Sequence, residues 1–89
     1  MIEKSLTVVN KLGLHARASA KLVNLTNRYQ SKINIRFRGN DVNAKSLLGL
    51  LTLAAGKGSQ VLVTLEGEDE EPALRAITKL FEERFGEKE

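Results

Sequence analysis

The chain has 89 residues, of which 42% are hydrophobic and 28% charged, so we expect one domain over residues 1–89 with one modest core. It has no cysteine and a single histidine, which excludes disulfides and argues against a bound metal. The net charge of +3 permits a nucleic-acid partner, but aromatic residues make up only 4% of the chain, few for a base-stacking surface, so we expect none.

The first two predicted elements are a strand and a helix. Over residues 2–9 apolar side chains fall mostly on one face, which predicts a strand, and the loop-forming residues 10–13 end it. The alanine- and leucine-rich segment that follows has apolar side chains at helical spacing, which predicts a helix from about Ala16 to Asn27.

A hairpin and a second helix come next. Apolar and polar residues alternate over residues 32–38, which predicts a strand with one solvent-exposed face. Residues 39–41 tolerate the positive φ angles of a hairpin turn. Ser46 is a good helix N-cap and precedes a long apolar run. We therefore predict a second helix that ends near the glycines of residues 56–58.

The last two predicted elements are a strand over residues 61–65 and a helix from about Pro72 to Phe85. The apolar stripe of this helix consists of Leu74, Ile77, Phe81 and Phe85. The resulting order, β-α-β-β-α-β-α, predicts an α+β fold. We expect a two-layer, open-faced β-sandwich in which helices cover one face of a four-stranded, mainly antiparallel sheet.

The single histidine, His15, lies at the start of the first predicted helix. There the unpaired backbone N–H groups of Ala16, Arg17 and Ala18 and the positive end of the helix dipole form a natural anion site. The Arg17 guanidinium can pair with phosphate oxygens, and a neutral imidazole is a nucleophile near neutral pH. These residues predict a phosphorylated histidine, although a capping histidine without chemistry fits the sequence equally well.

Other chemical arrangements fail. The glycines of residues 56–59 lack the upstream spacing of a phosphate-binding loop, and the acidic run 66–71 lacks the ligand pattern of a calcium loop. No second acid or base is placed near His15 by sequence spacing. We therefore expect a carrier that is consumed and regenerated, not a self-contained enzyme.

Three segments resemble motifs of HPr, the histidine phosphocarrier family of the bacterial phosphotransferase system: Gly13–Ser19, Asn43–Leu50 and Ala55–Gly58. The resemblance spans essentially the whole chain. It implies that enzyme I phosphorylates His15 on Nδ1 at the expense of phosphoenolpyruvate, without a bound cofactor. It further implies that an enzyme IIA accepts the phosphoryl group and that Arg17 stabilises it. Whether the chain belongs to the sugar or the nitrogen-related branch stays open.

The chain departs from the family pattern at Ala18, where the family usually has proline. Proline would withhold one N–H donor from the first helical turn. Alanine restores this donor but leaves the unfolded chain freer, which costs about 0.4–1 kcal/mol of stability. We expect carrier function to survive the change.

Ser46 has two expected roles. From the sequence it is a helix N-cap. The resemblance implies in addition that an HPr kinase/phosphorylase modifies Ser46 in organisms that have one. The new negative charge would then disturb docking of partners beside it.

The second helix is also a candidate partner-binding surface. We predict that Leu47, Leu48 and Leu51 form an exposed patch near His15, bordered by Lys21 and Lys45, although a helix buried all round is the open alternative. The residues of this helix assigned to the core are Leu50, Leu53 and Ala54.

The phosphocarrier is the leading hypothesis among three. The second is a regulatory binding module that acts through the leucine patch and is controlled by Ser46. The third is a small RNA-binding domain that uses Lys32, Arg36 and Arg38 on the open sheet face, and the scarcity of aromatics argues against it. The first residues lack the features of a signal peptide, and no apolar run approaches the roughly 20 residues of a membrane helix. We expect a cytoplasmic monomer without membrane insertion.

Overall fold

The computed structural model describes all 89 residues, and its strands and helices follow one another in the predicted order. The strands are β1 (Ile2–Thr7), β2 (Lys32–Phe37), β3 (Asn40–Asn43) and β4 (Gln60–Glu66). The helices are α1 (Ala16–Thr26), α2 (Leu47–Thr52) and α3 (Glu70–Glu82), and a 3₁₀ turn, η1 (Arg84–Gly86), follows α3. None of these helices is long and apolar enough to cross a membrane.

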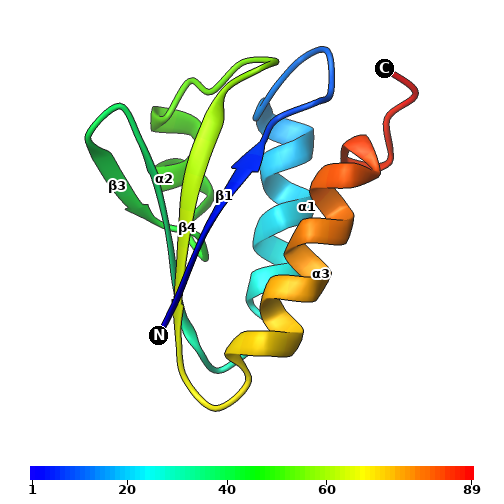
Figure 1. Ribbon diagram of the computed structural model, residues 1–89. Coiled ribbons are helices and arrows are strands. Elements are labelled where there is room, and N and C mark those ends of the chain that lie inside the picture. The colour runs from blue at the N-terminus through cyan, green and yellow to red at the C-terminus, as the bar shows by residue number, and fades with distance from the viewer.

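The strands form one antiparallel sheet in the order β1-β4-β2-β3. Val63 of β4 is opposite Ile35 of β2, and both are fully buried because they face the helices. Their neighbours Asn34 and Thr64 are also opposite each other, on the face without helices. In Figure 1, α1 and α3 run side by side along one side of the sheet. The prediction of an open-faced, two-layer sandwich is confirmed.

The second helix ends earlier than predicted, at Thr52. The hydroxyl of Thr52 donates to the carbonyl of Gly49 at 2.6 Å, and Ala54 has a φ of 52°, in the left-handed region that a helix cannot continue through. Leu50 and Leu53 are buried as predicted. The assignment of Ala54 to the core is wrong, because the chain has already left the helix there and the residue is exposed.

The third helix also ends early, at Glu82, whereas we predicted it to reach Phe85. Arg84 and Phe85 have φ angles of 56° and 55°, so the chain turns sharply after the helix. Phe85 is nevertheless buried as predicted, with its ring centroid 4.9 Å from that of Phe81. The turn sends the last residues toward the start of α1, as the position of the C-terminus in Figure 1 shows.

The apolar stripe of α3 differs from the prediction in one position. Ile77, Phe81 and Phe85 are buried, but Leu74 is only half-buried, and the small Ala73 takes the fully buried place beside the sheet.

Candidate functional site

His15 is the N-cap residue of α1, with the extended backbone angles φ −76° and ψ −178°. The hydrogen-bond ladder of the helix begins with the N–H of Ser19, which donates to the carbonyl of His15 at 2.9 Å. The N–H groups of Ala16, Arg17 and Ala18 therefore have no acceptor within the helix. His15 makes no side-chain cap bond to them, so these donors stay open at the end of the helix that carries the imidazole.

The loop before His15 is held by contacts with distant parts of the chain. The N–H of Leu14 donates to the carbonyl of Ala55 at 2.9 Å, and the buried Asn10 donates through Nδ2 to the carbonyl of Gly13 at 2.8 Å. Gly13 has a φ of +69°, and a Cβ at this position would lie 2.5 Å from the carbonyl oxygen of Ala55. Only glycine fits such a close approach without movement. The backbone of His15 is thus placed by tertiary contacts.

Glu87 is the neighbour of His15 that sequence reasoning missed. Its Oε2 contacts Nε2 of His15, and its Oε1 accepts a hydrogen bond of 3.1 Å from Nδ2 of Asn10. His15 and Glu87 are 72 positions apart, so no sequence spacing could have indicated the pair. Sequence spacing placed no acid or base near His15, and the turn after α3 brings one there.

The pKa of Glu87 lies below its usual value. Burial acts to raise this pKa, but the hydrogen bonds from Asn10 and His15 and the electrostatic influence of His15 and Lys21 together outweigh burial. Glu87 is consequently a carboxylate at neutral pH, and it places a negative charge on the Nε2 side of the imidazole.

A surface groove surrounds the imidazole. Its lining consists of Lys11, Leu12, His15, Ala16, Arg17, Glu87, Lys88 and Glu89. The structure thus brings the predicted pair, His15 and Arg17, into one groove. Arg17 is exposed and forms no ion pair, so its guanidinium is available to an anionic group.

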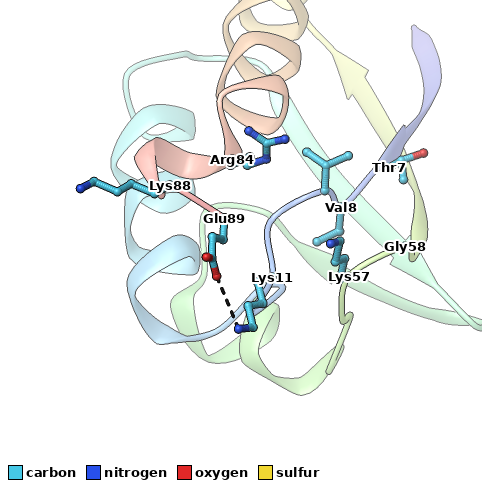
Figure 2. A pocket seen from close by; sticks show the side chains of 9 residues that line it. Thr7, Val8, Lys11, Lys57, Gly58, Arg84, Lys88 and Glu89 are labelled. Atoms are coloured by element: carbon cyan, nitrogen blue, oxygen red, sulfur yellow. Dashed lines mark ion pairs between the residues drawn. The ribbon is translucent and has the colours of Figure 1, made fainter.

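Lys88 and Glu89, the last two residues of the chain, line both this groove and a second one. The carboxylate of Glu89 lies 3.4 Å from Nζ of Lys11, the ion pair dashed in Figure 2. Figure 2 also shows Lys57, Arg84 and Lys88 around the second groove, so positive side chains outnumber negative ones there.

The sequence profile described as "PTS HPr component phosphorylation site" matches residues 2–83. The chain belongs to the HPr family. Among HPr relatives, the phosphocarrier protein HPr of Xylella fastidiosa (strain Temecula1) is 51% identical over 87 residues, 98% of each chain. That of Cupriavidus necator is 46% identical over 89 residues, 100% of each chain. The crystal structure of HPr-C-His from Thermoanaerobacter tengcongensis matches with a TM-score of 0.96 and 38% identity, and the match covers 100% of both chains.

Membership of the HPr family establishes the general function. The chain is a phosphocarrier of the phosphotransferase system and contains the histidine phosphorylation-site domain of that family. His15 is its only histidine.

Ser46 lies in the second motif of the HPr resemblance, at the N-terminus of α2. Its Oγ accepts a hydrogen bond of 3.1 Å from the N–H of Gly49, so the predicted capping role is confirmed. The neighbouring Leu48 is 76% exposed, and Leu47 and Leu51 are 39% and 38% exposed. The prediction that these leucines lie at the surface is confirmed, and the alternative of a helix buried all round is excluded.

Leu12 was not predicted as part of an apolar surface. It is 66% exposed and lines the groove beside His15. The only sequence feature that could have indicated this role is that Leu12 is an apolar residue in an otherwise polar loop.

The two lysines predicted to border the leucine patch are engaged within the fold. Nζ of Lys21 donates to the carbonyl of Phe85, and Nζ of Lys45 donates to the carbonyl of Tyr29, both at 2.7 Å. Lys21 thus supports the turn that carries Glu87. The role of either lysine toward partners stays a prediction.

Proposed function

We propose that this chain accepts a phosphoryl group on His15 from enzyme I, ultimately from phosphoenolpyruvate, and passes it to an enzyme IIA. The observation that carries the proposal is the position of the only histidine of a histidine-phosphorylation domain. It stands at the N-terminus of α1, beside three backbone donors that have no helical acceptor.

Phosphoryl transfer requires few catalytic groups from the protein. The lone pair of Nδ1 attacks phosphorus, an N–P bond forms, and the bond between phosphorus and the donor's leaving atom breaks. Positioning and charge stabilisation account for most of the catalysis of such transfers. The N–H groups of Ala16, Arg17 and Ala18 and the Arg17 guanidinium supply four sources of positive potential for the phosphoryl oxygens.

Partners would dock around the groove of His15. The exposed side chains of Leu12, Leu47, Leu48 and Leu51 offer an apolar contact surface. The cationic end of the molecule would steer acidic partners to it. We expect the carrier to act as a monomer, since each partner needs access to His15.

We further propose that Ser46 is a regulatory phosphorylation site for an HPr kinase/phosphorylase. A phosphate on its Oγ would lie at the N-terminus of α2, where the helix dipole tolerates it. It would also lie beside Leu47 and Leu48, where a double negative charge opposes docking onto an apolar surface.

The decisive experiment incubates the protein with enzyme I, magnesium and labelled phosphoenolpyruvate, and compares the wild type with His15→Ala. We expect acid-labile label in the wild type and none in the variant. Arg17→Ala serves as a second variant, in which the label should appear about 10- to 100-fold more slowly. An unlabelled wild type in the presence of an active enzyme I would refute the carrier function and favour the regulatory binding module.

A further inference from the structure

The C-terminal segment, residues 84–89, is fastened over the start of α1 at three points. Nζ of Lys21 donates to the carbonyl of Phe85, and the backbone N–H of Lys11 donates to the carbonyl of Glu89, both at 2.7 Å. The third point is Glu87, which contacts His15 and Asn10. Figure 2 shows Glu89 of this segment reaching toward Lys11. The fold therefore delivers Glu87 to the imidazole through contacts on both sides of it.

Asn10 is oriented by the carboxylate. Ionised Glu87 and the carbonyl of Gly13 can only accept hydrogen bonds, so Asn10 must direct its NH₂ group to both. This orientation leaves Oδ1 of the fully buried Asn10 without a partner. An unsatisfied buried oxygen costs stability, and the two hydrogen bonds to Gly13 and Glu87 offset that cost.

The contact decides which ring nitrogen carries the proton. An ionised carboxylate has no hydrogen to donate, so Nε2 of His15 must donate to it. In the neutral ring Nδ1 then bears the lone pair. When Nδ1 bonds to phosphorus while Nε2 keeps its proton, the ring becomes positively charged.

We propose that Glu87, held by Asn10, is a positioning residue for phosphorylation of His15: it keeps the proton on Nε2, leaves the Nδ1 lone pair free to attack, and balances the positive charge that the ring gains as the N–P bond forms. No proton leaves the ring in this step, and the same charge makes the imidazole a good leaving group when the phosphoryl group moves on. The proposal rests on the carrier function proposed above.

The test compares the wild type with Glu87→Ala and Glu87→Gln. With ¹⁵N-labelled histidine in the neutral ring, we expect wild-type signals of a protonated Nε2 and an unprotonated Nδ1. They should move toward the tautomer-averaged values in the alanine variant. The glutamine variant keeps an acceptor for Nε2 but loses the charge, so its ring signals should stay closer to those of the wild type. Phosphorylation by enzyme I should slow about tenfold or more in both variants, because both lose the charge on the ring's partner.

Glu83→Gln is the matched control, because Glu83 is an exposed acid just after α3 and lies outside the groove. It should phosphorylate at the wild-type rate, and the concentration of enzyme I giving half-maximal rate should be unchanged in all variants. Equal rates in Glu87→Ala and the wild type, or ring signals that do not change, would overturn the proposal. The ring signals are measured without enzyme I, so failure of the carrier function and failure of this proposal give different results.

Discussion

The N-termini of α1 and α2 differ in whether a side chain caps the free backbone N–H groups of the first turn. At α2 the hydroxyl of Ser46 accepts from the N–H of Gly49, a bond between residues three positions apart. At α1 the capping residue is His15, whose ring binds Glu87 and leaves the N–H groups of the first turn open. One helix end is capped by its own sequence, whereas at the other the capping residue binds a residue from the far end of the chain and makes no cap bond. An incomplete helix end is what a carried phosphoryl group requires.

The largest expected effect is at the loop that holds the open end of α1. Gly13→Ala puts a Cβ 2.5 Å from the carbonyl oxygen of Ala55 at a φ of +69°. We expect the free energy of unfolding to fall by about 2–4 kcal/mol, measured by urea denaturation.

Gly39→Ala is the control for this prediction. Gly39 has a similar φ of +81°, but a Cβ there would meet nothing within 4 Å. Its loss should be about 1 kcal/mol, from backbone strain alone. Equal losses in the two variants would show that the close approach to Ala55 does not hold the loop.

The second prediction tests the two caps directly. Ser46→Ala removes a cap bond and should lower the free energy of unfolding by about 0.5–2 kcal/mol. His15→Ala removes no cap bond and should cost less, because its hydrogen bond with Glu87 is partly solvent-exposed. Denaturation of both variants at neutral pH measures the difference. A larger loss for His15→Ala would contradict the view that only α2 is capped for stability.

The smallest expected effect is at Ala18, the third residue of α1. Its N–H has no helical acceptor, so proline can replace it without breaking a helical bond. Ala18→Pro should raise the free energy of unfolding by about 0.4–1 kcal/mol, since proline restricts the unfolded chain. It should also change the transfer rate or the lifetime of phosphohistidine, because one open donor is lost. Stability that falls instead would mean that the fully buried site has no room for the ring.

Some features of these helices could be predicted from the sequence, and others could be seen only in the structure. Ser46 and the start of α1 were predicted correctly because a cap and an amphipathic period depend on residues within one or two turns. The end of α2 was predicted too late because its apolar run continues past Thr52, and only the left-handed Ala54 ends the helix. Helix propensity does not predict this stop, because alanine does not by itself favour the left-handed conformation that Ala54 adopts.

The sequence by itself determined the order of elements, the open-faced sandwich and the placement of His15 at a helix start, whereas the structure decided that Leu47, Leu48 and Leu51 are exposed. The features determined by the sequence follow from local periodicity and capping, which depend on residues close together in the sequence. Only the tertiary structure decided that Ala54 is exposed, that Gly13 lies against Ala55, and that Glu87 meets His15. Such contacts join residues tens of positions apart, and their geometry is set by how the layers pack and where the chain turns.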